Sequence, residues 1–314
     1  MTQEMVAPDA DKRLKNGQYG ITIDRRFLTE IGLAVFVGLL FYLLYRPAMR
    51  HMYVGWRMVD SYYTHGFLIP LVSIAILWTK RKAILEAPRA SSPQGYVWVL
   101  GAGVMMLLAS FLGFQVIGQI SMIPMITGLL LLFQGTERTK VMWFSIAYLI
   151  FMIPLPGSVT QSFALQLKLA ATEMAVILSN WSMLPMVRDG SFIYWSTEAG
   201  SDHLLVGEVC GGLRSLIALL AFGALMAYIS KTRTWARILM LIAAGPIAIV
   251  ANVIRIYLLC LVGYMYGSEV AAGTFHDVSG YLIFVIAFVL FFTLEHQLRR
   301  LAPLDNPKEA EEAS

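Results

Sequence analysis

The sequence has little charge, and this shortage narrows the classes of protein to which the chain can belong. Of its 314 residues only 14% are charged, whereas 58% are hydrophobic. A soluble globular chain has about 25% charged and about 45–50% apolar residues. The composition therefore excludes a soluble enzyme and a disordered protein.

Cysteine and histidine are also scarce. The two cysteines, Cys210 and Cys260, are too few for a disulfide framework or a cysteine-based metal site. The five histidines are scattered and form no His-Glu-x-x-His motif. The sequence therefore predicts no metal and no cofactor.

Long apolar segments recur from about residue 28 to about residue 294. A spanning helix needs about 20 mostly apolar residues. The pattern predicts an all-α fold, a polytopic membrane helical bundle of about eight transmembrane helices at 27–298. A tail at 1–26 precedes it and a tail at 299–314 follows it. The predicted helices are 27–45, 63–79, 95–113, 115–133, 141–156, 211–229, 236–263 and 277–295.

The basic residues predict the orientation of these helices. The net charge is +4, and the bases cluster between apolar segments, which the positive-inside rule explains better than nucleic-acid binding does. Alternate connections hold 17 and five of the 24 Lys and Arg residues. Both termini and both tails are therefore expected in the cytoplasm, provided that the chain turns tightly at Gly113-Phe114. The first helix is expected to remain as an anchor because no small-residue cleavage site follows it.

The long connection 157–209 is predicted to lie outside the cytoplasm. Within it, 160–178 has helical periodicity that predicts a helix in the membrane interface. The alternative is a ninth spanning helix, which would have to bury Lys168 and Glu173. The strand-like segments 191–197 and 203–209 flank a turn-like one and predict a short β-hairpin. The apolar face of the predicted helix consists of Phe163, Leu167, Ala170, Met174, Ile177 and Leu178.

A first group of polar residues begins the helix 211–229. Cys210 is expected at a helix N-terminus, where the free N–H groups favour a thiolate. Arg214 lies one turn further on the same face, and its positive charge would also favour the thiolate. Gly211 and Gly212 would let a substrate backbone approach, and Glu208 adds a carboxylate. The structural alternative is that Cys210 is a small buried side chain and that the glycines serve helix packing.

Two further groups lie inside or beside apolar segments. Arg255 falls within the helix 236–263, with Asn252 three residues before it on the same face. His276 falls where the last helix begins. The structural alternatives are an Arg that reaches the headgroups or pairs with an acid such as Glu208, and a His that belongs to a helix cap formed by Asp277 or Thr274.

The predicted topology brings Cys210, Arg255 and His276 to one face of the membrane. A thiolate can attack a peptide carbonyl, and an imidazole can take the thiol proton and protonate the leaving amine. A guanidinium can stabilise the oxyanion of the tetrahedral intermediate. The three side chains together are typical of a thiol acyl transferase.

The motifs EVCGGLR, ANVIRIY and FHDVSG, in this order and spacing, resemble those of the exosortase/archaeosortase family of integral-membrane sorting enzymes. The N-terminal segment THGFLIP is similar too, though less specific. The residue after the nucleophile is often Ser in that family and is Gly211 here, which leaves the subfamily and the recognised motif open. The matching residues are Glu208, Cys210, Gly212, Leu213, Arg214, Asn252, Arg255, Ile256, His276, Ser279 and Gly280.

The resemblance implies a cysteine protease or transpeptidase of the bacterial inner membrane. It implies a catalytic triad of Cys210, Arg255 and His276 facing the periplasm, with Glu208, Gly211, Gly212, Arg214 and Asn252 as supporting or substrate-binding residues. Substrates would be secreted proteins with a C-terminal PEP-CTERM-like signal: a short motif, a transmembrane helix and a basic tail. The product would be released, or transferred to an exopolysaccharide or lipid-linked acceptor. The implied partners are these substrates and membrane lipids, with no nucleic acid.

Other interpretations of the same residues remain open at this point. A transporter or flippase would use Arg214 and Arg255 as an anion site, although the sequence shows no internal repeat. A lipid-linked glycan polymerase or ligase would use Arg and His without a thiol. Cys210 and Cys260 could also form a structural disulfide.

Overall fold

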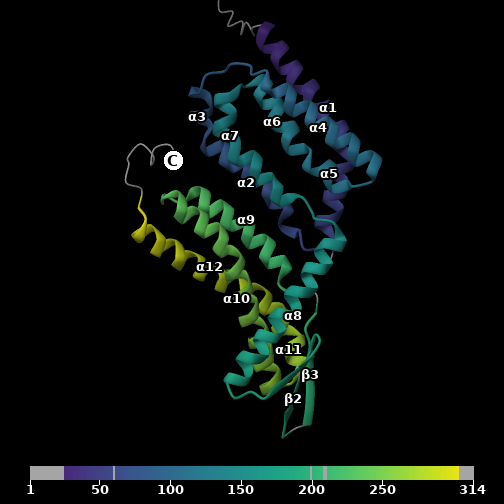
Figure 1. The fold of residues 1–314 in the computed structure, drawn as a ribbon, viewed down its shortest axis with the longest axis vertical. Coiled ribbons are helices and arrows are strands. Elements are labelled where there is room, and N and C mark those ends of the chain that lie inside the picture. Colours follow the sequence, from purple (N-terminus) through teal and green to yellow (C-terminus); the bar gives the residue numbers. More distant parts are fainter. Residues whose placement is uncertain (1–24, 59–60, 199, 208–210, 304–314) are drawn as a thin grey trace, which may run out of the picture. The chain divides into compact units, whose positions relative to one another are not determined.

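The computed structural model describes residues 25–58, 61–198, 200–207 and 211–303 (Figure 1). The chain divides into two compact units, residues 1–46 and 47–314. The elements in order are α1 (Arg25–Arg57), η1 (Thr64–Phe67), α2 (Leu68–Thr79), α3 (Arg81–Glu86), α4 (Gln94–Leu112), α5 (Gln115–Ile120), α6 (Met122–Phe133), α7 (Thr136–Tyr148), η2 (Leu149–Met152), α8 (Gly157–Trp181), β1 (Met186–Asp189), β2 (Phe192–Thr197), β3 (Gly200–Leu205), α9 (Leu213–Ile229), α10 (Thr234–Tyr266), α11 (Ser268–Ala272) and α12 (Thr274–Leu301).

The described part of the first unit is the beginning of α1. Most of its described apolar side chains are exposed, as expected for a helix whose solvent is lipid. The helix continues to Arg57 with Pro47 inside it, so it is longer than the predicted 27–45. All contacts and sites described below lie in the second unit.

Among the residues that the structure describes, six helices are long and apolar enough to cross a membrane, and two apolar helices, Thr64–Thr79 and Leu213–Ile229, are shorter. The prediction of a polytopic helical membrane protein is therefore confirmed. The predicted number of eight spans is not confirmed. The predicted spans 63–79 and 211–229 correspond to the two shorter helices, 141–156 is not among the six, and Gly157–Trp181 is one of the six although it was not in the predicted set. The six are Leu28–Arg57, Gln94–Leu112, Gln115–Phe133, Gly157–Trp181, Thr234–Tyr266 and Val278–Leu301.

The predicted turn at Gly113-Phe114 is confirmed. Gly113 ends α4 in the left-handed conformation, at φ 71°, and the next helix begins at Gln115. The returning α6 packs closely on α4, since a Cβ atom on Gly95 would lie 2.6 Å from the carbonyl oxygen of Gly128. Small residues allow such close approach of membrane helices.

The segment predicted as a single helix at 141–156 is instead divided. The α-helix α7 ends at Tyr148 and continues as the short 3-10 helix η2 to Met152. Pro154 explains this end, because proline disfavours helical backbone in the residue before it and has no N–H to donate.

The helix predicted at 160–178 is confirmed as the longer α8, but the face that packs was not foreseen. Small residues such as Ala171, Thr172 and Ala175 are buried and face α10. The predicted apolar face is exposed, with Phe163 at 60% and Met174 at 48%. Small residues pack helices in lipid and large apolar ones face it, so this distribution fits a helix within the membrane as well as one lying at its surface.

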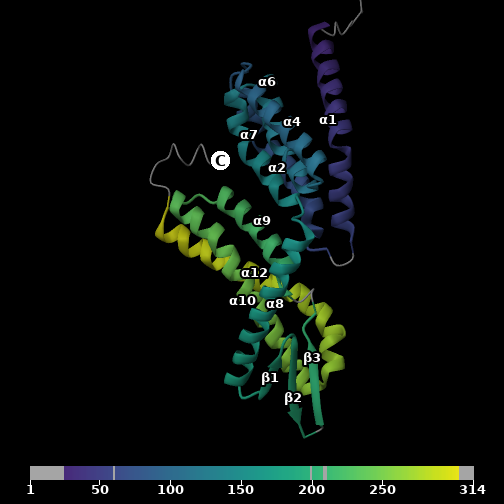
Figure 2. The ribbon, with the colours of Figure 1, turned by 45° about the vertical axis from the view of Figure 1, so that its right-hand side comes forward.

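The predicted hairpin is confirmed and belongs to a three-stranded antiparallel sheet of order β1-β2-β3 (Figure 2). The four residues of β1 give too short an alternation to have been recognised in the sequence. Ile193 and Trp195 of β2 are buried in a core that α8 and α10 share. Gly263 of α10 leaves room for Trp195, because a Cβ atom there would lie 2.9 Å from the indole. The sheet is therefore part of the folded core.

Asp202 joins the sheet to α11. Its Oδ2 atom accepts a hydrogen bond of 2.8 Å from the backbone N–H of Ser268. Hydrogen bonds from the Ser268 side chain and backbone lower the pKa of Asp202 below its ordinary value of 3.8. A lowered folded-state pKa means that the stabilisation is present above the unfolded pKa and is lost as the pH falls through the folded one.

We therefore expect Asp202→Asn to lower the stability by about 1 kcal/mol at pH 7, a value reduced for solvent exposure. The difference between variant and wild type should shrink below about pH 3.8. Thermal unfolding of the detergent-solubilised protein at pH 7 and pH 3 measures both. Asp189→Asn on the exposed end of β1 is the control and should have little effect; a pH-independent Asp202→Asn difference would contradict the assignment.

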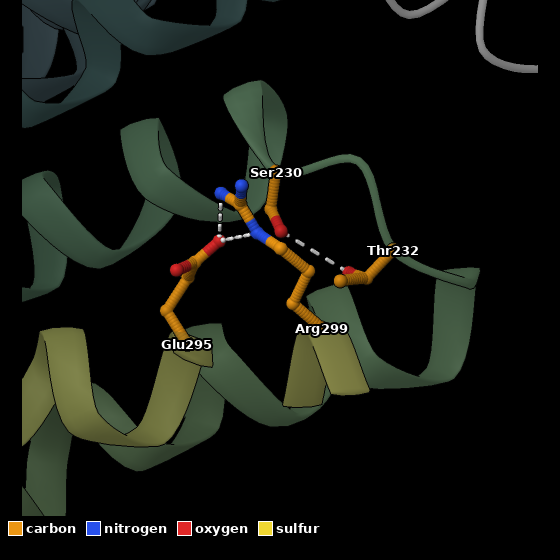
Figure 3. A network of polar contacts seen from close by, with 4 residues as sticks. All are labelled: Ser230, Thr232, Glu295 and Arg299. Atoms are coloured by element: carbon orange, nitrogen blue, oxygen red, sulfur yellow. Dashed lines mark hydrogen bonds and ion pairs between the residues drawn. The ribbon is translucent and has the colours of Figure 1, made fainter. Parts of the chain in front are cut away.

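The helices α9, α10 and α12 pack against one another (Figure 1). Met240, Ala244 and Phe291 are fully buried between them. At the end of α12, Arg299 pairs with the buried Glu295, and Ser230 bonds Thr232 at 3.2 Å in the α9–α10 turn (Figure 3). The backbone N–H of Arg233 donates to the carbonyl of Ala302. The α9–α10 turn and the end of α12 are thereby held together.

Candidate active site

Arg255 is a charged side chain buried in α10, where it is only 6% exposed. The helix around it is apolar and rich in alanine, which allows α9, α12 and α8 to pack closely against it. Burying a cation is costly unless hydrogen bonds compensate it. The partners of Arg255 therefore decide whether it is a structural or a functional group.

These partners lie in the first turns of α12. The helix begins at Thr274, so His276 lies at its start, as the sequence predicted. The Nε atom of Arg255 donates to Ser279 Oγ at 3.0 Å. Its Nη2 atom donates to the backbone carbonyl of His276 at 3.3 Å and lies 3.4 Å from Nε2 of the same residue. The Ser279 hydroxyl in turn donates to the His276 carbonyl at 2.8 Å. Two of the three predicted triad residues thus meet.

This arrangement has a chemical consequence for the imidazole. A guanidinium can only donate hydrogen bonds, so its contact with Nε2 favours the form of the ring in which Nε2 is unprotonated. An unprotonated Nε2 can act as a base. The guanidinium is anchored on one side by Ser279, and no described residue accepts a hydrogen bond from its Nη1 atom.

The loop before α9 packs against α10, the helix that carries Arg255. Gly212 adopts φ 82°, and a Cβ atom there would lie 2.7 Å from Nδ2 of Asn252. A Cβ atom on Gly211 would lie 3.3 Å from the carbonyl oxygen of Ala164 and from Cβ of Lys168, both in α8. The two glycines are therefore held between α8 and α10, and Asn252 precedes Arg255 by about one turn.

Cys210 and Glu208 lie outside the described residues. Their predicted roles, as nucleophile and as supporting residue, stay predictions. Arg214 is described, and it has no hydrogen bond or ion pair with Arg255, His276 or Ser279. Instead it lines a separate cavity against α2 and α7. Cys260 is a free, fully buried thiol, which gives no support to a Cys210–Cys260 disulfide.

A small cavity of about 170 Å³ opens beside His276. The end of β3 and the residues after it form one wall, with Leu205, Val206 and Gly207, and Leu259 of α10 forms part of the other. Within the described ranges, no three His, Cys, Asp or Glu side chains gather closely enough to hold a metal ion. The cavity has room for one or two side chains of a peptide next to the imidazole.

Comparison with protein families identifies the relationship. The model of the family described as transmembrane exosortase (Exosortase_EpsH) matches residues 56–293, which is more than half of the chain. The chain belongs to this family. No curated protein and no solved structure matches it.

Membership of the exosortase family confirms the resemblance inferred from the three motifs. The match also covers THGFLIP, whose Thr64–Phe67 forms η1. The chain is thus a membrane protein of the exosortase group, with Arg255 and His276 in contact.

Ser279 is the residue whose role the sequence did not reveal. It lies within the FHDVSG motif. Its position three residues after His276 on a helix places both on one face, and this spacing was the available signal. The fully buried Ser279 hydroxyl accepts a hydrogen bond from Nε–H of Arg255 and donates one to the His276 carbonyl. We assign it the role of positioning the guanidinium.

The Gly212–Asn252 contact makes a testable prediction. Gly212→Ala should destabilise the protein by about 2 kcal/mol or more, because alanine is strained at positive φ and its Cβ atom would overlap Asn252. Thermal unfolding in detergent measures this loss. The matched control is Gly245→Ala in α10, where a Cβ atom meets nothing within 4 Å and helix propensity should improve. Equal stability of the two variants would contradict the packing described here.

Proposed function

We propose that this exosortase is a membrane-embedded cysteine peptidase and transpeptidase acting on secreted proteins. Its substrates would carry a C-terminal PEP-CTERM-like sorting signal. The single observation that carries the proposal is the contact of Arg255 with His276 and Ser279 at the start of α12, in a chain that belongs to the exosortase family. The proposed triad is Cys210, His276 and Arg255.

In the first step, the Cys210 thiol replaces Nη2 of Arg255 as the hydrogen-bond donor to Nε2 of His276. Nε2 then takes the thiol proton, and the sulfur attacks the scissile carbonyl carbon. The carbonyl electrons move to oxygen, and Arg255 stabilises this oxyanion through Nη1. When the intermediate collapses, the C–N bond breaks and the imidazolium protonates the leaving amine. A thioester of Cys210 with the substrate remains.

In the second step, water or an acceptor nucleophile attacks the thioester. Its proton passes to His276, the C–S bond breaks, and the proton returns to the sulfur. With water the protein is released; with an exopolysaccharide or lipid-linked acceptor it is transferred. Support for placing Cys210 here comes from its covalent link to Gly211 and from the packing of Gly212 on Asn252, near Arg255.

The proposed location is the inner membrane of a bacterium, with both termini cytoplasmic. The excess of Lys and Arg in one set of connections supports this orientation. The triad then faces the periplasm, where secreted substrates arrive. A substrate anchored by its own transmembrane helix could diffuse in the membrane plane and present the short motif beside the helix to His276.

The test is co-expression of the chain with a secreted reporter that carries such a C-terminal signal. Wild type should convert the precursor to a shorter, released or surface-linked product, and a reporter without the signal should stay unprocessed. Accumulation of uncleaved precursor with every candidate signal, at normal membrane levels of the chain, would overturn the proposal. Mass spectrometry of the product identifies the cleaved bond and any acceptor.

The cavity between β3 and His276 is the proposed site for the short motif. Deleting the hairpin is a poor test, because Ile193, Trp195 and Leu204 belong to the buried core. Leu205→Arg is sharper, because Leu205 lines the cavity and is 55% exposed. It should raise the KM for the reporter about tenfold while kcat changes little, since it removes ground-state binding. Val187→Arg on β1 is also exposed and is the control; a KM equal to that of wild type in both variants would place the motif elsewhere.

A further inference from the structure

A second cavity, of about 540 Å³, lies apart from the Arg255–His276 contact. It is bounded by η1 and α2 with the end of α7 on one side, and by α9 and α12 on the other. Neither Arg255 nor His276 lines it. Its volume falls within the range of about 300–1,000 Å³ that is usual for small-molecule sites.

The polar side chains of this cavity gather at one end of the helices. Arg214 is the second residue of α9, Thr64 and His65 lie in η1, and Tyr148 is the last residue of α7. The helices η1 and η2 contact each other there, which brings the start of α2 and the end of α7 together. The cavity therefore has a defined polar end.

Two groups at this end lack partners. The Nε atom of Arg214 is buried and has no hydrogen bond within the described part of the chain. Both ring nitrogens of His65 are also buried and unpaired; the Phe151 carbonyl lies near the ring but forms no hydrogen bond of normal geometry. Burying polar atoms without hydrogen-bond partners is costly, and an anionic ligand that accepts hydrogen bonds from these groups would remove this cost.

The rest of the cavity is apolar. Its lining continues along α9 to Phe222 and Leu225 and meets Phe288 of α12. Leu225 is 11 residues beyond Arg214, which corresponds to about 16 Å along the helix. The cavity therefore has a cation at one end and an apolar channel that leads away from it. This lining is complementary to an anionic amphiphile.

We propose that this cavity binds one anionic phospholipid, with its phosphate on Arg214 and His65 and an acyl chain beside Phe222, Leu225 and Phe288. A phospholipid is abundant in the membrane that surrounds these helices, and its phosphate accepts several hydrogen bonds from a guanidinium. The inference is independent of the proposed peptidase function.

The experiment is native mass spectrometry of the full chain after delipidation and titration with one lipid at a time. The probes are palmitoyl-oleoyl phosphatidylglycerol, which is anionic, and palmitoyl-oleoyl phosphatidylcholine, which is zwitterionic with the same chains. We expect one phosphatidylglycerol to bind saturably, at least about tenfold more tightly than phosphatidylcholine. Arg214→Gln should abolish this preference, and Ala218→Phe, which fills the apolar part, should weaken binding of both lipids.

Two matched variants separate the site from general effects. Arg237→Gln changes an arginine of α10 whose Nε atom is likewise unpaired but which lies outside the cavity, and Ala170→Phe adds a ring on the exposed face of α8. Both should bind phosphatidylglycerol as wild type does. Equal affinity for the two lipids, binding that survives both Arg214→Gln and Ala218→Phe, or crosslinking of a substrate transmembrane segment into the cavity in place of lipid would each overturn the proposal.

Discussion

Replacing Cys210 by alanine is expected to abolish processing of a secreted reporter. The proposed mechanism has no other group that can form the acyl intermediate, because the only other cysteine, Cys260, is fully buried. Removing the nucleophile of a serine protease that works through a comparable triad lowers kcat by about 10⁶-fold. A loss of this size leaves no product on an immunoblot. Membrane levels of the variant should equal those of wild type.

This prediction separates the proposal from its rivals. A transporter or flippase that uses Arg214 and Arg255 as an anion site, and a glycan polymerase or ligase without a thiol, both tolerate Cys210→Ala. The matched control is Cys260→Ala, which leaves a small cavity in α10 but keeps the nucleophile. A thioester between Cys210 and the reporter, trapped by acid quenching and identified by mass spectrometry, gives direct evidence. Full processing by Cys210→Ala would eliminate the cysteine mechanism.

Arg255→Lys is expected to lower kcat by about 10²–10³-fold with a small change in KM. Lysine keeps the charge, but a single ammonium cannot reproduce the planar arrangement in which Nε donates to Ser279 and Nη2 donates to the His276 carbonyl. Loss of one oxyanion donor in a soluble enzyme has an effect of this size. Reporter cleavage by membranes or purified protein, measured against substrate concentration, gives kcat and KM separately.

Two further variants show whether geometry is the cause. Arg237→Lys changes an arginine near the other end of the same helix and should leave kcat unchanged within about twofold. Ser279→Ala keeps the guanidinium and removes its anchor, so it should lower kcat by about tenfold. Wild-type activity of both Arg255→Lys and Ser279→Ala would show that the contact only stabilises the fold.

The sequence predicted the helices best where their side chains face lipid. Apolar segments of about 20 residues predicted the spans around α4, α6, α10 and α12, and Gly113 predicted the turn between two of them. Hydropathy does not show where an α-helix ends and a 3-10 helix begins, so it did not predict the division of 141–156 at Tyr148. It made no prediction of the packing face of α8, which is the side with small residues, because small residues allow close packing of helices in lipid.

The contact between two of the candidate residues was predictable from the sequence, and the details of that contact were not. The motif spacing and the topology indicated that Arg255 and His276 would approach each other, and they do. The positioning role of Ser279 follows from side-chain geometry that no spacing argument supplies. Arg214 shared a motif with Cys210, yet its side chain lines another cavity, because neighbours in sequence at a helix start point in different directions around the axis.

The hydrogen bonds of Arg255 also bear on when the protein becomes active. The acceptors for its guanidinium, Ser279 and the His276 carbonyl, belong to α12, the last described helix in the order of synthesis. A nascent chain that has inserted α10 but not yet α12 carries an unanchored guanidinium and no imidazole beside it. Ribosome-bound chains therefore lack the complete set of residues that the proposed mechanism requires, and that mechanism cannot operate in them until translation has passed residue 279.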